Sequence, residues 1–108
     1  MSRTLSKKAY TMDKTELKNQ IEDFLTSEGF SLIEYQGEPN VWEKGIGMAT
    51  AREYIKVDIQ DKNVELSGWI HAGISNSGKR EKDLDGVVGS IPKKEVRKRM
   101  EKILLLVS

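Results

Sequence analysis

Residues 52–71 constrain the fold more than any other segment, because apolar and polar side chains alternate along them on both sides of a short polar turn. A period of two places alternate residues on opposite faces of a strand. Residues 61–63 are typical of a tight turn, so the two halves are predicted to form an antiparallel hairpin. Its apolar face is predicted to carry Ile55, Val57, Ile59, Val64, Leu66 and Ile70. Its wetter face is predicted to carry Tyr54, Lys56, Asp58, Gln60, Glu65, Ser67, Trp69 and His71.

Residues 13–28 have the pattern of an amphipathic helix. Asp13 is a good N-cap residue, and Glu16 stands three positions later, where its carboxylate can bond the amide of the cap. Gly29 is predicted to end the helix in a left-handed conformation, with Phe30 folding back onto the last turn. The apolar face is predicted to carry Leu17, Ile21, Phe24 and Leu25.

A second helix is predicted over residues 93–107, with Pro92 at its start. Leu105 and Leu106 lie off the apolar stripe, so the end of this helix is predicted to tuck under a sheet edge or to meet a second copy of the chain. The stripe itself is predicted to carry Val96, Met100, Ile103, Leu104 and Val107.

Residues 30–35 and 40–48 are predicted to add further strands, separated by a turn over residues 36–40. The predicted fold is therefore α+β: a two-layer sandwich in which an antiparallel sheet of 3–5 strands carries both helices on one face. Residues 1–11 have no periodicity and are predicted to be a flexible N-terminal arm, and residues 12–108 a single domain.

Two glycine-containing segments have part of a nucleotide-binding motif. Residues 73–79 have the spacing G-x-x-x-x-G-K, but Arg80 stands where such a loop needs a hydroxyl for magnesium, and the expected sheet is antiparallel. Gly45 and Gly47 have the spacing of a dinucleotide fingerprint, but Thr50 stands where its third small residue belongs. Both segments are interpreted as turns or bends, and no cofactor is predicted.

The sequence contains no recognisable catalytic or metal-binding constellation. His71 is the single histidine, which excludes sites built from paired histidines, and a lone general base lacks a nucleophile at a recognisable spacing. The chain has no cysteine and therefore no disulfide or thiolate site, which suits a reducing cytosol. We predict that the protein is not an enzyme and holds no metal.

The N-terminal residues have charge but no apolar segment, so no secretory signal is predicted. The longest apolar run, ILLLV, is far too short to span a membrane. These features predict a cytoplasmic protein without a membrane partner.

Besides the apolar end of the last helix, two surfaces are candidates for binding. On the wetter face of the sheet, Tyr54 and Trp69 are expected to be neighbours and, with His71, to form an aromatic surface for another protein; the alternative is that Trp42 or residues 72–90 cover Trp69. On the last helix, basic side chains are expected to form an anion or nucleic-acid contact, or an ordinary solvated face. They are Lys94, Arg97 and Lys98, with Arg3, Lys7 and Lys8 of the N-terminal arm nearby.

Three further segments carry a recognisable combination of motifs. They are V-W-E-K-G-I-G at 41–47, L-S-G-W-I at 66–70 and L-D-G-V-V-G-S-I-P-K-K at 84–94. This combination resembles a group of small uncharacterised bacterial proteins, typical of Gram-positive species. In longer chains a similar segment follows a zinc ribbon, which this chain lacks because it has no cysteine. The resemblance implies a bacterial cytoplasmic setting and no function.

The sequence therefore predicts a non-catalytic module that binds another protein or a second copy of itself, through the outer face of the sheet or an exposed strand edge. The alternative is weak electrostatic binding to nucleic acid through the basic last helix and the N-terminal arm.

Overall fold

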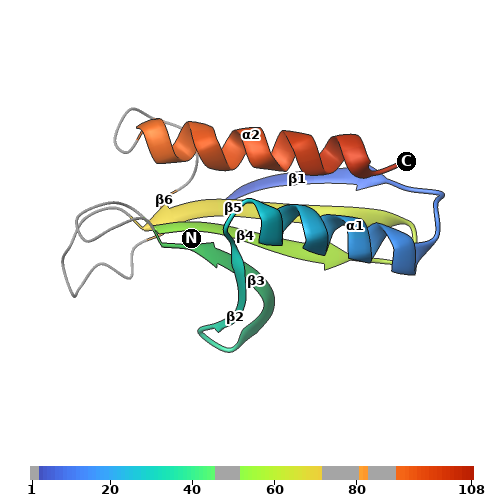
Figure 1. Ribbon diagram of the computed structural model, residues 1–108, viewed down its shortest axis with the longest axis horizontal. Coiled ribbons are helices and arrows are strands. Elements are labelled where there is room, and N and C mark those ends of the chain that lie inside the picture. The colour runs from blue at the N-terminus through green and yellow to red at the C-terminus, as the bar shows by residue number, and fades with distance from the viewer. Residues whose placement is uncertain (1–2, 46–51, 72–80, 83–89) are drawn as a thin grey trace.

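The computed structural model describes residues 3–45, 52–71, 81–82 and 90–108. These residues form an α+β fold with a five-stranded antiparallel sheet, a short sixth strand and two helices (Figure 1). In chain order the elements are β1 (Thr4–Ala9), α1 (Lys14–Ser27), β2 (Ser31–Tyr35), β3 (Glu38–Lys44), β4 (Arg52–Ile59), β5 (Asn63–His71), β6 (Glu81–Lys82) and α2 (Ser90–Leu106).

The strand order in the sheet is β1-β5-β4-β3-β2. The β4–β5 hairpin lies at the centre, and its register pairs Tyr54 with Trp69, as the alternation predicts. The two-residue strand β6 pairs with the end of β5. The turn end of the β2–β3 hairpin bends out of the plane of the other strands (Figure 1).

The N-terminal segment is the main difference from the sequence prediction. Residues 1–11 were predicted to be a flexible arm, and this prediction is wrong for residues 4–9, which form β1 along the edge of β5. No apolar alternation marks β1, because five of its six side chains are polar or small and its buried neighbours come from β5. Its backbone hydrogen bonds to β5, rather than a hydrophobic pattern, place it in the sheet.

Helix α1 is bounded as its sequence predicts. The Asp13 side chain accepts a hydrogen bond from the amide of Glu16 at 3.0 Å. The Glu16 carboxylate was predicted to accept a hydrogen bond from the amide of Asp13. It instead accepts one from the side chain of Gln20 on the next turn. At the other end Gly29 has φ +91°, and the amide of Phe30 donates to the carbonyl of Leu25 at 2.9 Å. This is a Schellman motif, which only a residue tolerant of positive φ can close at low cost.

The turn between β2 and β3 is tighter than predicted. Gln36 and Gly37 both have positive φ, which gives a two-residue hairpin turn, whereas residues 38–40 were predicted to be turn and belong to β3. Asn40 also has positive φ, at 62°, and an extra residue of β3 lies beside β2 at this point. Such a bulge bends a strand and increases its twist.

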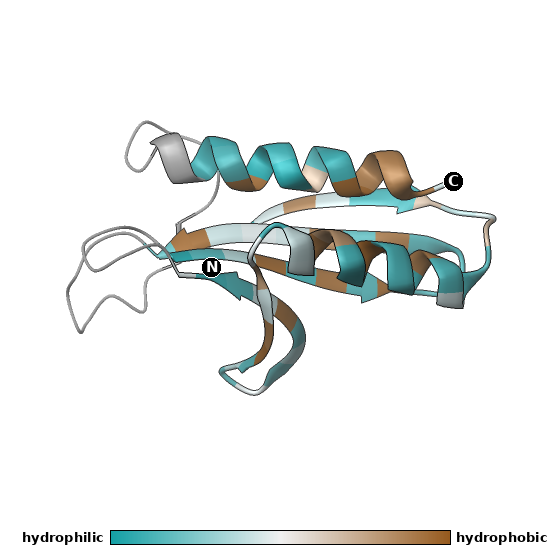
Figure 2. Ribbon diagram, in the orientation of Figure 1, coloured by the Kyte–Doolittle hydropathy of each residue, from teal (hydrophilic) through white to brown (hydrophobic). Residues whose placement is uncertain are grey.

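The main core is one hydrophobic cluster to which both helices and the strands of the sheet contribute side chains. Helix α1 contributes Leu17, Ile21 and Leu25, and the sheet contributes the apolar face that the alternation predicts, together with Trp42. Helix α2 contributes its predicted stripe, and its apolar residues are most frequent toward its C-terminal end (Figure 2). The members from α2 and the following residue are Val96, Met100, Ile103 and Val107, with Leu104 partly buried.

Candidate functional site

The second face of the sheet carries a small aromatic core. Tyr54 and Trp69 stack with ring centroids 5.5 Å apart and nearly parallel planes. Tyr35 of β2 lies across both rings at 4.9 and 5.3 Å, because the β2–β3 hairpin curls over this face. Val41 completes the cluster. Aromatic pairs in such geometry contribute packing beyond the area that they bury.

Arg3 closes this aromatic core from the opposite edge of the sheet. Its guanidinium lies 3.8 Å from the centre of the Trp69 ring and forms two hydrogen bonds with the carboxylate of Glu38, at 2.7 and 2.9 Å. Lys56 reaches the same carboxylate at 2.9 Å. The bonds from Arg3, and then the contact with Lys56, lower the pKa of Glu38 to about 2. Arg3, just before the edge strand β1, and Glu38 of β3 therefore meet over β4 and β5.

The predicted aromatic contact surface is consequently not open to a partner. Trp69 is fully buried and Tyr54 nearly so, hence the prediction that they form an exposed anchor is wrong. The predicted alternative was that Trp42 or residues 72–90 cover Trp69. Trp42 does not, because it lies in the main core on the other face, and residues 72–80 and 83–89 lie outside the described residues. His71 is half-buried, and its Nε2 lies 2.6 Å from the hydroxyl of Tyr35. His71 therefore borders the aromatic core, beside the hydroxyl of Tyr35.

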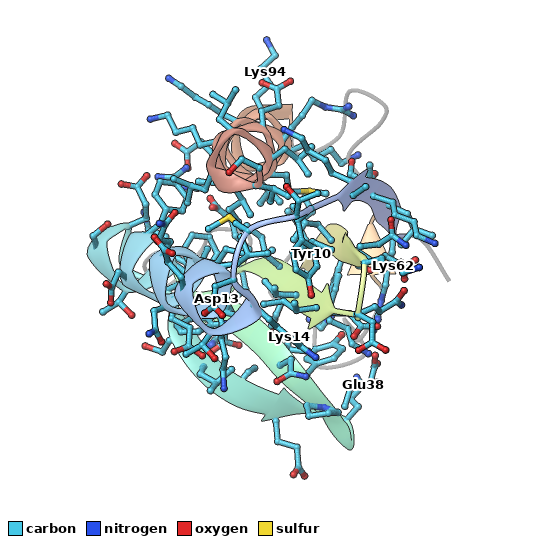
Figure 3. All side chains as sticks on the ribbon, turned by 90° about the vertical axis from the view of Figure 1, so that its right-hand side faces the viewer. Tyr10, Asp13, Lys14, Glu38, Lys62 and Lys94 are labelled. Atoms are coloured by element: carbon cyan, nitrogen blue, oxygen red, sulfur yellow. The ribbon has the colours of Figure 1, made fainter. Side chains whose placement is uncertain are left out.

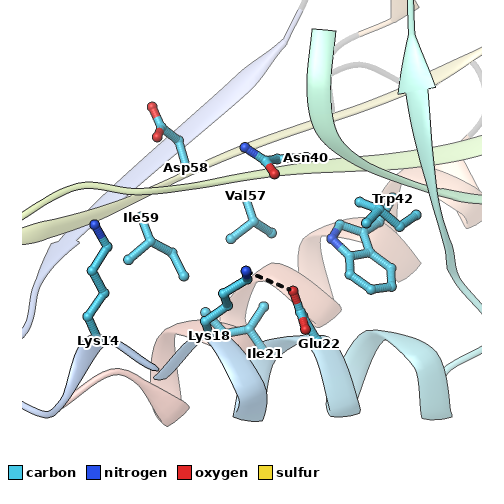
Figure 4. A pocket seen from close by; sticks show the side chains of 10 residues that line it. Lys14, Lys18, Ile21, Glu22, Asn40, Trp42, Val57, Asp58 and Ile59 are labelled. Atoms are coloured by element: carbon cyan, nitrogen blue, oxygen red, sulfur yellow. Dashed lines mark ion pairs between the residues drawn. The ribbon is translucent and has the colours of Figure 1, made fainter. Parts of the chain in front are cut away.

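A cleft opens where β3 separates from β4. The two strands pair from Lys44–Glu53 as far as Val41–Lys56, and β4 then continues to Ile59 paired with β5 but no longer with β3. The bulge at Asn40 turns β3 away at this point, and α1 passes beneath the gap (Figure 4). The resulting cleft has a volume of about 290 Å³.

The cleft has an apolar interior and a charged rim. Ile21, Leu32, Trp42, Val57 and Ile59 supply the apolar side chains, and Leu32 is 55% exposed. Lys14 and Lys18 stand on the α1 side and Asp58 on the sheet side (Figure 4). The rim is completed by Glu22, which pairs with Lys18 at 4.0 Å, and by Asn40. Half of the residues that line the cleft are polar or charged, so the cleft is more polar than a typical small-molecule pocket.

A buried carboxyl lies on the helix face, away from this cleft. Glu53 is fully buried beneath α2, and among the described residues neither of its carboxylate oxygens has a hydrogen-bond donor. Desolvation, and then the neighbouring carboxylate of Glu95, raise the pKa of Glu53 to about 8, against the opposing effects of Arg99 and Lys44. At neutral pH Glu53 is therefore mostly protonated and can donate a hydrogen bond to Glu95.

The basic side chains predicted on the last helix lie where the sequence places them. Lys94, Arg97 and Lys98 are exposed on α2, and Lys94 points away from the sheet (Figure 3). Lys8 of β1 donates to the carbonyl of Leu104 at 2.8 Å, which brings β1 beside the last turns of this helix. Arg3, by contrast, lies on the aromatic face and does not join them.

Arg99 of α2 pairs with carboxylates on both helices. Arg99 lies 3.8 Å from the carboxylate of Glu95 on the same helix, and its Nε lies 3.2 Å from Glu28 at the end of α1. Arg99 thereby links the two helices.

Several predicted features lie outside the described residues. These are the glycine-rich segment 73–79 with Arg80, Gly47, Thr50 and residues 84–89. Within the described ranges, no group of three or more acidic, histidine or cysteine side chains is placed to hold a metal ion. Neither described helix combines the length and the apolar character that crossing a bilayer requires.

Sequence reasoning missed three parts of these sites, although two had a signal. Glu53 occupies an inward position in the alternation of Ile55 and Val57, so its burial was readable from the pattern. Asn40 is one of the few residue types that tolerate positive φ, and it follows a proline. Arg3 had no signal, because its position over Trp69 depends on the pairing of β1 with β5.

Searches with this chain found no matching family model, curated protein or solved structure, so the resemblance to small bacterial proteins stays a prediction.

Proposed function

We propose that this chain is a non-catalytic module that binds another protein in the cleft between α1, β3 and β4. The observation that carries the proposal is the early end of the β3–β4 ladder, which leaves the last residues of β4 beside an apolar opening. An open strand edge next to an apolar groove is a recurrent means of recognising an extended segment of a partner.

A two-layer arrangement of sheet and helices, which we propose for this fold, is consistent with binding a partner in the cleft. In a two-layer sandwich with both helices on one face, the main core holds the sheet from one side. Arg3 and Glu38 join residues of the other face. The end of β4 near Ile59 is paired with β5 on one side, while its β3 side stays open. A rigid, preformed site lowers the entropy cost of binding.

A selection experiment with matched variants tests the proposed function. Random peptides displayed on phage would be selected against the wild-type protein and then tested on Leu32→Asp and Leu105→Asp. Both leucines are exposed, at 55% and 81%, but only Leu32 lines the cleft. Supporting peptides bind the wild type and Leu105→Asp and lose binding to Leu32→Asp. Failure to enrich any peptide, or equal binding to both variants, would overturn the proposal.

The second candidate function is electrostatic binding to nucleic acid. Its support is that the basic side chains of α2 extend toward β1, where Lys7 and Lys8 are also exposed. Phosphate contacts of this kind produce binding that weakens steeply with salt. Glu101 lies among these basic residues, and no aromatic side chain for base stacking is found beside them in the described part of the chain, so this candidate ranks second.

A further inference from the structure

We infer that the cleft accepts an extended segment of the partner as an added strand beside the end of β4, and that this segment alternates apolar, basic and apolar residues. The inference rests on the proposed function and specifies the chemistry of the partner. The backbone of β4 gives the binding mode, and the side chains on the two faces of β4 give the alternation.

The backbone of β4 presents bonding groups to the cleft. The amide of Gln60 donates to the carbonyl of Asn63 at 2.8 Å, which directs the backbone groups of Gln60 toward β5. Successive residues of a strand direct these groups to opposite sides. Ile59 therefore directs its N–H and C=O toward the β3 side, three residues beyond Lys56, the last residue of β4 that β3 pairs. An extended segment can bond to these groups as β3 does earlier in the strand.

The inward positions of an added strand require apolar side chains. Residues directly opposite each other in neighbouring strands point to the same face. Side chains opposite Val57 and Ile59 would therefore point toward α1, above Ile21 and beside Trp42. The opening of about 290 Å³ at this point is large enough for branched aliphatic side chains.

The outward position between them requires a basic side chain. Asp58 points to the other face of β4, and the residue directly across from it in β5 is Glu65. Two like charges in this position repel each other. The Asp58 carboxylate accepts a hydrogen bond from the Gln60 side chain at 3.3 Å, but within the described structure it has no ion pair, and the nearby Lys56 is bound to Glu38. Lys7 of β1 lies directly across from Glu65 on its other side, and a lysine or arginine of the added strand would place a positive charge on the open side of Asp58 in the same way.

Synthetic peptides test both features of the segment. The probe is Ser-Gly-Ile-Lys-Ile-Gly-Ser, and its matched control is Ser-Gly-Ile-Glu-Ile-Gly-Ser. A third peptide carries N-methyl groups on both isoleucines, whose backbone amides would face β4. Titrations followed by amide chemical shifts should show about fivefold tighter binding of the lysine peptide than of the glutamate peptide, with shifts centred on Ile59. The N-methylated peptide should not bind.

Reversing the charge at position 58 tests whether Asp58 recognises the charge of the central peptide residue. In Asp58→Lys the preference should reverse, so that the glutamate peptide binds more tightly. This variant is expected to fold, because it replaces the like-charged Asp58–Glu65 pair with an attractive one. Equal affinity of the two peptides, an unchanged order in Asp58→Lys, or full binding of the N-methylated peptide would overturn the strand-addition inference.

These outcomes separate the inference from the proposed function. If peptides selected from the library still require Leu32 but show neither the alternation nor a dependence on Asp58, the cleft binds a partner by another mode and only the inference fails. A concentration-dependent dimer that Leu32→Asp abolishes in the absence of peptide would assign the cleft to a second copy of the chain and would overturn the inference.

Discussion

At the scale of single residues, the buried carboxyl of Glu53 makes stability depend on pH. Its ordinary pKa of 4.5 is raised to about 8 by burial and by Glu95. Between these values the folded protein holds a proton that the unfolded chain has lost, so the free energy of unfolding falls as pH rises. The slope reaches at most about 1.4 kcal/mol per pH unit, and it disappears above about pH 8.

The variant Glu53→Gln is predicted to remove this slope, because the amide stays neutral at every pH. Urea unfolding between about pH 5 and about pH 8 measures it. Glu101→Gln, on the exposed side of α2, is the control and should keep the wild-type slope. A wild-type profile that is already flat in this range would show that Glu53 is not protonated in the folded protein.

Trp69 is predicted to stabilise the fold rather than to contact a partner. Because the ring is fully buried between Tyr54, Tyr35 and Arg3, Trp69→Ala should cost about 3–5 kcal/mol of unfolding free energy. Leu5→Ala, at a residue 63% exposed on β1, should cost less than about 0.5 kcal/mol. Denaturant unfolding compares the two. A Trp69→Ala protein as stable as the wild type would mean that the aromatic face is open in solution.

At the scale of the elements, the local signals of capping and alternation were sufficient where they were strong. Asp13, Gly29 and the alternation of residues 52–71 predicted α1, β4 and β5 because each depends on neighbouring residues in the chain. The β2–β3 turn was predicted to be too long, since the proline and asparagine that mark turns here lie inside β3 at its bulge.

The end of α1 gives a prediction at this scale. Gly29→Ala should lower the free energy of unfolding by about 1 kcal/mol, because alanine is strained at φ +91°. The cost is backbone strain, since an added Cβ would meet only the flexible side chain of Lys44 at an ordinary 3.5 Å. Gly45→Ala is the matched control: it has no positive φ and should change stability little. Thermal or urea unfolding measures both, and equal effects would contradict the role of the Schellman motif.

At the scale of the whole molecule, the contact of Arg3 with Glu38 joins β1 to β3 across the intervening strands. Because the pKa of Glu38 is lowered to about 2, its contribution to stability is present above about pH 4.5 and is lost as pH falls toward about 2. Glu38→Gln should therefore be less stable than the wild type at neutral pH, and the difference should shrink on acidification. Unfolding curves across this range test it, and a constant difference would contradict the lowered pKa.

The distribution of charge over the molecule gives a test of the second candidate function. We expect a labelled mixed-sequence duplex to bind weakly at both about 50 and about 200 mM salt, because carboxylates interrupt the basic surface of α2. Fluorescence anisotropy measures this binding. Tight binding at low salt that falls at high salt, and that the triple variant Lys94→Glu, Arg97→Glu and Lys98→Glu abolishes, would instead support nucleic acid as the partner.

The sequence by itself determined the α+β class, the two helices, the central hairpin and the inward face of each, because these follow from caps and periodicity within one segment. Only the tertiary structure decided that residues 4–9 form a strand, that Trp69 is buried under Arg3, and that β3 leaves β4 near Asn40. Each of these depends on pairing between segments distant in the chain. The hydrogen bonds and ring contacts that create such pairing are available to many residues and leave no local pattern.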